Sequence, residues 1–245
     1  MSVYKYLVPY VTVENKKINI LEYIFKKNTL KFTCPLDFND PFEVKPHIKK
    51  YVIPNLPGFA NLLNETKNVN KFYEIERYEI LKNVGILSLS SVYTSLTMWA
   101  HYANNHQGIV IEFDESHDFF NPKLEFNSKI PCFLHGLKKV LYKQKRLSIN
   151  SDNWVQEENF LIKSNDWAYE NEYRMTIILD ESSNSDKYNI KFPSEVITSV
   201  YIGYNATQET INYILNLKTH DMWKNLKIYK CFPCEREYKL GITEL

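Results

Sequence analysis

The sequence predicts an α+β protein built on a strongly bent, mixed or antiparallel β-sheet with flanking helices. Segments rich in strand-forming residues, such as 84–90 and 196–202, intermix with amphipathic helical segments along the chain. Consecutive strands are not uniformly separated by helices, as a doubly wound parallel fold requires. With 245 residues, the length favours one domain over residues 1–245, with a helical insertion at about 44–83.

The charge balance gives the chain no overall attraction to nucleic acid or to acidic lipid. Thirty Lys and Arg residues face 29 Asp and Glu residues, so the net charge is +1. A local basic groove remains compatible with this balance. The sequence shows neither a secretion signal pattern nor an apolar run of roughly 18 residues, so we expect a cytoplasmic protein without a membrane partner.

The four cysteines are too few and too scattered for a disulfide framework. Cys231 and Cys234 resemble a redox dithiol or half of a zinc site. A second pair that would complete tetrahedral zinc is missing from the sequence, and no apolar helix follows as in a redox site. We therefore expect no bound metal.

The first third of the chain alternates between strands and helices. Phe38 to Glu43 lies in a loop with two prolines, where we expect Asn and Asp side chains to bond the local backbone. The predicted elements are a strand at 3–8, a helix at 18–27 closed by Asn28, a strand at 29–33, the loop at 34–43 and a long surface helix at 59–83.

The middle of the chain contains the segment richest in chemistry. A helix at 96–104, capped by Thr94 or Ser95 and ended by Gly108, leads into a strand at 109–114. Ile109, Ile111 and Phe113 are expected on one face of that strand. The other predicted elements are strands at 84–90, 137–142 and 196–202, a helix at 152–164, a strand within 167–179, a turn at 182–186, a helix from Thr207 and a hairpin of 227–231 with 237–242.

A pair of carboxylates is the strongest candidate for a reactive site. Glu170, Glu172 and Arg174 are spaced by two, so on a strand all three side chains leave the same face. Two adjacent carboxylates raise the proton affinity of one of them unless Arg174 or a substrate cation compensates. Such a pair suits stabilisation of an oxocarbenium-like centre in glycosidic bond cleavage. An ordinary surface ladder of Glu and Arg is the alternative.

The helix before Gly108 supplies imidazole and aromatic groups. His101 and His106 are five residues apart, which is the wrong spacing for two metal ligands on one helical face. Either histidine is a candidate acid or base, or a structural residue. Trp99 and Tyr102 are candidates for stacking on a base or a nicotinamide ring, or for the core, and for Trp99 we prefer the core.

The loop oxygens of Asn39, Asp40 and Glu43 are candidates for binding a ribose or a metal. A loop held by its own side-chain bonds explains Asn39 and Asp40 equally well.

Five ordered motifs together resemble a widespread bacterial family of unknown function. They are YKY at 4–6, LKFTCP at 30–35, FNDPFE at 38–43, MWAHYANNHQG at 98–108 and WAYENEYR at 167–174. The resemblance spans most of the chain, and it implies no activity by itself.

A more distant resemblance does imply an activity. The order of a first-strand aromatic motif, a helix leading to a short strand, and a late Glu-x-Glu strand is similar to the ADP-ribosyltransferase superfamily. That superfamily binds NAD in a cleft of a split, bent β-sheet, so the resemblance implies an ADP-ribosyltransferase-like fold. It makes Glu172 the glutamate that stabilises the ribosyl cation and Glu170 its companion. Tyr6 or Lys5 takes the first-strand position that usually carries His or Arg. The contacts with the ribose and pyrophosphate of NAD are then left to Arg174, His101 or the loop of Asn39 and Asp40.

On this resemblance we expect an enzyme that cleaves the nicotinamide–ribose bond of NAD, acting as a bacterial toxin or anti-phage effector. NAD is its substrate. The acceptor would be a protein or a nucleic acid, and a cognate antitoxin or defence-system protein would be the partner. The expected catalytic residues are Glu172, Glu170 and His101; the expected substrate-binding residues are Tyr4, Lys5, Tyr6, Asn39, Asp40, Trp99, Tyr102, His106, Trp167 and Arg174.

Two alternatives come from other classes. A metal-dependent nuclease or nucleic-acid binder would gather four oxygen-bearing residues around a divalent cation and present a basic groove. The oxygen-bearing residues are Asn39, Asp40, Glu43 and Glu112, and the basic ones are Lys138, Lys139, Lys143 and Arg146. A non-catalytic interaction module would instead bury Trp99, His101 and Glu172 in mutual contact, with no adjoining cleft.

Overall fold

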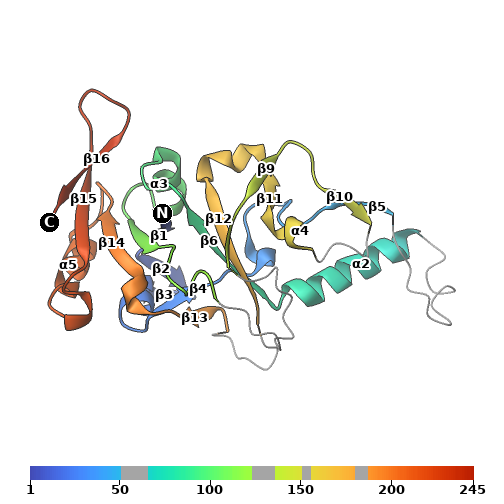
Figure 1. Ribbon diagram of the computed structural model, residues 1–245, viewed down its shortest axis with the longest axis horizontal. Helices are drawn as coiled ribbons and strands as arrows, with labels where there is room; N and C mark the ends of the chain where they lie inside the picture. Colours follow the sequence, from blue (N-terminus) through green and yellow to red (C-terminus); the bar gives the residue numbers. More distant parts are fainter. Residues whose placement is uncertain (51–65, 123–135, 151–155, 180–186) are drawn as a thin grey trace.

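The computed structural model describes residues 1–50, 66–122, 136–150, 156–179 and 187–245 (Figure 1). Within these ranges an eight-stranded sheet has the order β16-β15-β14-β7-β1-β6-β12-β8. All neighbouring strands are antiparallel except β14 and β15, so the sheet is mixed and the predicted α+β class is confirmed. The strands are β1 (Ser2–Leu7), β6 (Val84–Ser90), β7 (Ile109–Asp114), β8 (Leu137–Lys139), β12 (Glu172–Ile178), β14 (Ile197–Ile202), β15 (Lys227–Pro233) and β16 (Leu240–Glu244).

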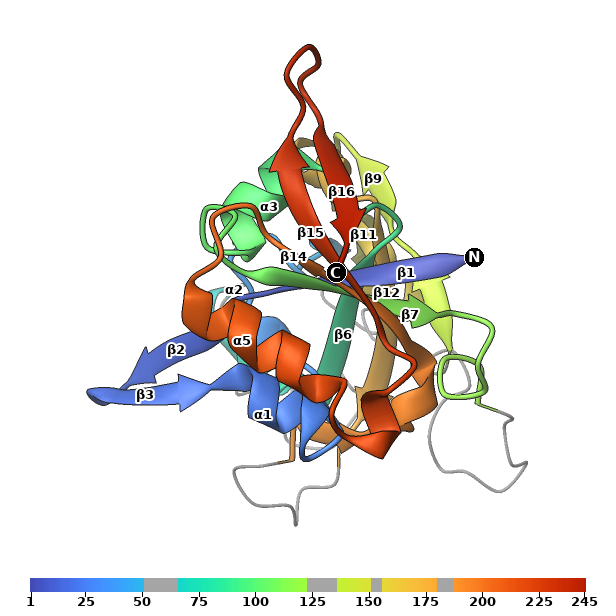
Figure 2. The ribbon, with the colours of Figure 1, turned by 90° about the vertical axis from the view of Figure 1, so that its left-hand side faces the viewer.

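The sheet nearly divides between β1 and β6. β1 pairs with β7 along its whole length, and β12 pairs with β6 in the same way. Between β1 and β6, Tyr4 opposite Ser90 is the one registered pair among the described residues. Figure 2 shows β6 crossing the direction of β1 and β7 steeply. The backbones therefore diverge on either side of this pair.

Four two-stranded ladders flank the sheet in the described ranges. Two are parallel and lie on the β12 side of the molecule, on the right of Figure 1. The antiparallel ladders are β2 (Tyr10–Val13) with β3 (Lys16–Asn19) and β4 (Thr29–Lys31) with β13 (Asn189–Lys191); the parallel ladders are β5 (His47–Lys50) with β10 (Ser148–Asn150) and β9 (Leu141–Lys143) with β11 (Ile162–Ser164).

Helices cover both faces of the β14-β7-β1 half of the sheet (Figure 2). On one face, α1 (Ile20–Phe25) and α5 (Gln208–Leu217) pack into a core that contains Ile109, Ile111 and Phe113. On the other face, α3 (Leu96–Tyr102) buries Met98 and Trp99 against a cluster that contains Val110. The predicted alternation along 109–114 is thus confirmed.

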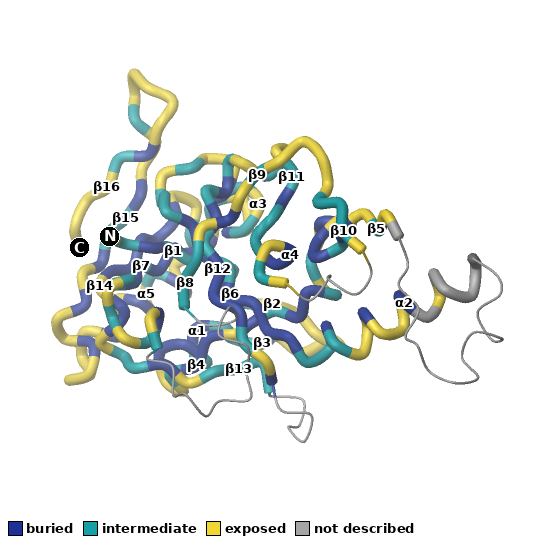
Figure 3. Tube along the Cα trace, turned by 45° about the vertical axis from the view of Figure 1, so that its right-hand side comes forward, coloured by how far each residue is buried: buried dark blue, intermediate teal, exposed yellow. Residues whose placement is uncertain are grey.

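The β6-β12 half has a separate core with the longest helix. This core joins α2 (Thr66–Leu81) and α4 (Glu157–Leu161) to β6. Figure 3 shows burial concentrated in the sheet, while exposed residues mark the outer surface of α2 and the tip of the β15–β16 hairpin. Four short 3-10 helices complete the described elements: η1 (Pro35–Asp37), η4 (Asn165–Glu170), η5 (Ser194–Val196) and η6 (Asp221–Trp223).

Two predicted elements on this side differ in the structure. The strand at 137–142 divides into β8, which pairs with β12, and β9, which pairs with β11. The helix at 152–164 is limited in the described residues to α4, and Ile162–Ser164 is strand β11. Pairing with β9 supplies hydrogen bonds that a short, unsupported helix end lacks.

The chemistry-rich helix α3 begins as predicted but ends early. Ser95 caps it, since its hydroxyl accepts from the Met98 N–H at 3.3 Å. The helix ends at Tyr102 because Asn104, Asn105 and His106 have positive φ. Gly108 has a different role: a Cβ there would lie 2.2 Å from the Leu7 carbonyl oxygen. The glycine therefore allows β7 to approach β1.

Several other predictions agree with the structure. The Asp40 carboxylate accepts from the Phe42 N–H at 2.8 Å, as expected for this loop. The helix predicted at 18–27 is shorter in the structure: it spans Ile20–Phe25 with Lys26 as its C-cap, and Asn28, with φ of 50°, lies two residues beyond that cap. Thr207 caps α5, and the C-terminal hairpin is present. The start of the helix at 59–83, the turn at 182–186 and the start of the helix at 152 lie outside the described residues. Among the described helices, none has the length and apolarity needed to cross a bilayer.

Candidate functional site

A cavity of about 390 Å³ opens where the sheet divides, and we call it the split-sheet cavity. It lies between β1, β6, the start of β12, α3 and the loop around η1. Its volume falls in the range of small-molecule sites. It brings together eight of the residues expected to form the site: Tyr4, Lys5, Tyr6, Asn39, Tyr102, Glu170, Glu172 and Arg174.

A buried ion-pair network forms one wall of the split-sheet cavity. The Arg174 guanidinium binds both Glu172 oxygens, with Nε to Oε1 at 2.8 Å and NH2 to Oε2 at 2.9 Å. Its NH1 group donates to Glu43 Oε1 at 2.7 Å and to the Phe160 carbonyl at 2.7 Å. Arg174 is only 1% exposed and Glu172 only 4%. Because the spacing of two places both side chains on one face of β12, the predicted pairing is confirmed.

Lys163 joins the two carboxylates expected to react. Its ammonium lies 2.5 Å from Glu170 Oε2 and 3.2 Å from Glu172 Oε2. It comes from β11, a segment expected to be helical, and it was not predicted as a site residue. The sequence offers one weak signal, since Lys163 follows the apolar pair Leu161 and Ile162, where a buried lysine requires anionic partners.

Glu170 reaches this network from a 3-10 helix, which corrects the prediction that it lies on the strand. It is the last residue of η4, and Asn171 follows with φ of 45° and ψ of 48°. This left-handed residue ends η4 and starts β12, so the alternation of faces begins only at Glu172. Lys163, rather than a shared strand face, holds Glu170 beside Glu172.

The pKa values of the two carboxylates are shifted in opposite directions from the usual value of a glutamate. Burial raises the pKa of Glu172, but the charges of Arg174 and Lys163 outweigh burial and lower that pKa to about 2. Burial raises the pKa of Glu170, since Lys163 compensates it only in part. A pair of acids whose pKa values are moved apart is the usual arrangement for dividing acid–base roles.

Lys5 supplies a third ionisable group at the cavity. It extends from β1 and donates to the Ser88 carbonyl at 3.2 Å. Burial lowers the pKa of its ammonium to about 8, against the opposing effect of Glu172. The first strand therefore places a cation beside Glu172.

Aromatic side chains line the remaining walls of the split-sheet cavity. The Tyr102 hydroxyl donates to Glu170 Oε1, and the Tyr6 hydroxyl donates to the Val92 carbonyl at 2.9 Å. The Arg174 guanidinium lies over the Phe38 ring, with its central carbon 5.5 Å from the ring centroid. Phe38 belongs to the FNDPFE motif, so the motif marked this position although its role was not predicted.

Five predicted site residues, Asp40 among them, lie outside the described lining of this cavity. Trp99 is fully buried and donates to the Tyr93 carbonyl at 2.7 Å, which agrees with the preferred core interpretation. His101 is exposed and contacts the Tyr169 hydroxyl at 3.1 Å. His106 stacks on Trp99, with ring centroids 6.1 Å apart. Trp167 packs against the Lys163 ammonium at 4.9 Å from its ring centroid.

The residues of the nuclease alternative do not meet at one point. Glu112 accepts from Tyr201 at 2.9 Å on the sheet, Asp40 bonds its own loop, and Glu43 binds Arg174. In the described part of the chain, no group of three or more His, Cys, Asp or Glu side chains is suited to hold a metal ion. The contacts required by the interaction-module alternative are also not found, since His101 is exposed and a cavity adjoins Glu172.

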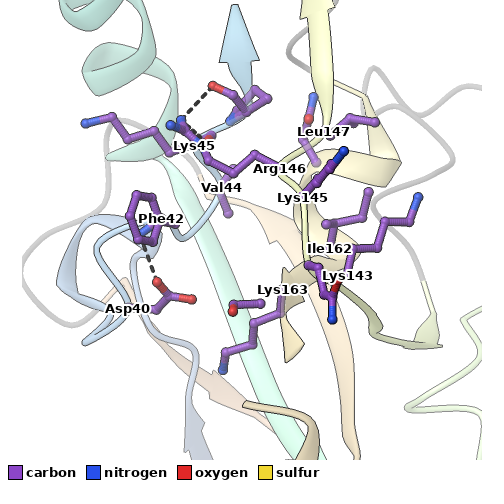
Figure 4. Close-up of a pocket in the computed structure, with 14 residues that line it drawn as sticks. Asp40, Phe42, Val44, Lys45, Lys143, Lys145, Arg146, Leu147, Ile162 and Lys163 are labelled. Atoms are coloured by element: carbon purple, nitrogen blue, oxygen red, sulfur yellow. Dashed lines mark hydrogen bonds between the residues drawn. The ribbon is translucent and has the colours of Figure 1, made fainter. Parts of the chain in front are cut away.

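A second cavity, of about 220 Å³, is also lined by Lys163, and we call it the basic cavity (Figure 4). Asp40 and Phe42 form one side of it, and the segment from Lys143 to Leu147 forms the other. Lys143 and Arg146, two residues of the predicted basic groove, thus lie together here. Lys138 lies elsewhere and pairs with Glu157. Lys163 lines both cavities.

Comparison with known proteins yields one finding. No curated protein matches the chain, and no solved structure matches it. A family model matches residues 98–175, a range that starts in α3 and ends in β12. This range contains the MWAHYANNHQG and WAYENEYR motifs, and with them Lys163, Glu170, Glu172 and Arg174. The model is that of the family described as Protein of unknown function (DUF2971), so this match confirms the resemblance to a family of unknown function over these residues.

Proposed function

We propose that the chain cleaves the bond between nicotinamide and ribose in NAD, as an ADP-ribosyltransferase-like enzyme or an NAD glycohydrolase. The observation that carries the proposal is the pair of carboxylates at the split-sheet cavity, with the pKa of Glu172 lowered to about 2 and that of Glu170 raised. Cleavage of a glycosidic bond needs one carboxylate that stays ionised and one group that exchanges a proton.

Glu172 is the group that stabilises the developing positive charge on the ribose ring. It is ionised at neutral pH, and it lines the cavity. A carboxylate has about four acceptor positions, and Arg174 and Lys163 occupy three of those of Glu172. The Ser88 side chain, which also lines the cavity, makes a further hydrogen bond to Glu172. Nicotinamide leaves as a neutral pyridine with the electron pair of the broken C–N bond, so its departure needs no acid.

Glu170 is the base that accepts the proton of the attacking water or acceptor hydroxyl. Its raised pKa brings it closer to the pH at which it works, which favours proton transfer. As the new C–O bond forms at the ribose carbon, the proton of the attacking oxygen moves to Glu170. We assign this step to Glu170 in place of His101, since His101 is exposed and held by Tyr169.

The fold around the cavity supports the same assignment. In the resembled superfamily NAD lies in a cleft of a split sheet, and the split-sheet cavity lies at such a division, between β1 and β6. Lys5 supplies a cation from the first strand, where that superfamily usually has His or Arg. Tyr4, Phe38 and Tyr102 offer ring surfaces for nicotinamide. From the resemblance alone, we extend the proposal to a toxin or anti-phage role with a protein or nucleic-acid acceptor.

The test is nicotinamide release from NAD, followed by chromatography with the purified protein. We expect release by the wild type and a fall of at least about 100-fold for Glu172→Gln, since charge stabilisation of this kind is worth about 10²-fold or more. Glu158→Gln is the matched control, because Glu158 is exposed and undergoes the same chemical change. Full activity of a folded Glu172→Gln variant would contradict the role of Glu172.

A second variant separates chemistry from folding. Glu170→Gln keeps a side chain that hydrogen-bonds Tyr102, but it removes the base. We expect loss of activity with a thermal midpoint close to that of the wild type. Absence of nicotinamide release from wild-type protein supplied with water, protein and nucleic-acid acceptors would overturn the proposed function itself.

A further inference from the structure

The basic cavity concentrates positive charge in a chain that is almost neutral overall. Five of its lining residues are cationic, namely Lys45, Lys143, Lys145, Arg146 and Lys163, and Asp40 is its one acidic lining residue. The full sequence of 245 residues carries a net charge of only +1. A local excess of this size in a concave site attracts anions.

Three of these cations have no anionic partner within the part of the chain that the structure describes. Among the described residues, no ion pair involves Lys143, Lys145 or Arg146. Lys45 lies 4.0 Å from Glu74, and Lys163 is bound to its glutamates. Cations left unneutralised around a cavity are available to a ligand, in contrast to those of the ion-pair network.

The backbone holds this wall in place before any ligand binds. Segment 143–147 connects two parallel ladders, and Ser164 lies opposite Lys143. Arg146 donates from Nε to the Lys45 carbonyl at 3.0 Å and from NH2 to the Pro46 carbonyl at 2.9 Å. The contacts of the described residues leave its NH1 group for an anion. An arginine fixed in this way loses little entropy on binding phosphate.

The facing wall is aromatic. Phe42 lines the cavity and is 54% exposed, and the Arg146 guanidinium lies 5.4 Å from its ring centroid. The Phe42 backbone is fixed by its bond to Asp40. Cations on one side and an exposed ring on the other fit a ligand that joins phosphate to a flat base. The cavity holds only about 220 Å³, whereas a nucleic-acid strand needs a groove that follows several nucleotides.

We propose that the basic cavity binds a nucleoside diphosphate group, with Lys143, Lys145 and Arg146 on the phosphates and Phe42 on the base. Lys163 lines both cavities, so a ligand bound in the basic cavity lies next to the split-sheet cavity. The connection between the two cavities rests on the proposed function, since NAD contains such a group, whereas binding at the basic cavity does not.

The test is calorimetric titration of the whole chain with ADP at low salt. The triple variant Lys143→Gln, Lys145→Gln, Arg146→Gln is expected to lose at least about tenfold in affinity, since each lost charge-assisted hydrogen bond costs about that factor. Its control is Lys224→Gln, Lys227→Gln, Arg236→Gln, which removes the same charge from exposed positions outside the cavity. Equal losses in both variants would show general charge attraction and overturn the site.

Fragments of the ligand test each wall separately. Inorganic pyrophosphate should bind more weakly than ADP, and adenosine should not bind measurably. Phe42→Ala should weaken ADP several-fold and leave pyrophosphate unchanged, as expected for loss of stacking. Identical affinities for ADP and pyrophosphate would overturn the contact of Phe42 with the base. Binding of a single-stranded oligonucleotide that ADP does not displace would overturn the small-ligand site in favour of nucleic acid.

The two proposals fail in different ways. Absence of ADP binding by the wild type, together with nicotinamide release from NAD, would overturn the basic-cavity site and leave the reaction in place. ADP binding that the triple variant abolishes, without nicotinamide release from NAD, would support the site and overturn the reaction.

Discussion

The split-sheet cavity and the basic cavity share Lys163 but use charge in opposite ways. In the network beside the split-sheet cavity, the carboxylates of Glu43, Glu170 and Glu172 are buried. They form ion pairs with Lys163 and Arg174. At the basic cavity, Lys143, Lys145 and Arg146 are exposed, and no ion pair of the described residues engages them. Compensated buried charges hold groups in defined protonation states, whereas uncompensated exposed charges attract a ligand.

The largest expected effect separates the two cavities by stability. Arg174→Met leaves Glu43 and Glu172 buried with Lys163 as their remaining cation, so we expect a loss of about 3–5 kcal/mol in the free energy of unfolding. Lys145→Met removes a cation from the exposed wall, and we expect a change within about 0.5 kcal/mol. Urea denaturation of both variants measures the difference. Similar losses would mean that the basic cavity is also part of the folded core.

Lowering the pH should reduce the stability that ionised Glu172 contributes at the split-sheet cavity. The pKa of Glu172 is lowered in the folded state from 4.5 to about 2, so its stabilisation is present above pH about 4.5. It is lost as the pH falls toward 2, by on the order of 2 kcal/mol. Glu172→Gln should flatten this part of the curve of unfolding free energy against pH. The exposed Glu158→Gln variant should keep the wild-type slope.

Replacing Lys163, which lines both cavities, should give a smaller change that is specific to the pH profile of activity. The charge of Lys163 lowers the pKa of Glu170 against the effect of burial, so Lys163→Met should raise that pKa further. If Glu170 is the base, the acidic limb of kcat/KM for NAD should move to higher pH, because the deprotonated form then appears later. Lys163→Arg should restore part of the shift. An unchanged pH profile with reduced stability would indicate a purely structural lysine.

The predictions from sequence succeeded where the physical cause is local. Glu172 and Arg174 share a face of β12 because strand alternation requires it, and Ser95 caps α3 through the next turn of its own helix. They failed where a contact with a distant segment decided the outcome. Ile162–Ser164 became a strand because β9 pairs with it, and Asn171 moved Glu170 off the strand by adopting a left-handed conformation.

By itself, the sequence determined the α+β class, the alternating faces of 109–114, the local bond of Asp40 and the carboxylate–arginine pair on β12, because these depend on residues a few positions apart. Only the tertiary structure decided that β1 and β6 diverge after one pair, and that Lys163 and Glu43 complete the network. It also decided that segment 143–147 faces Phe42. These features depend on pairing between strands far apart in the chain, where the free energy of burial and ladder formation outweighs local preference.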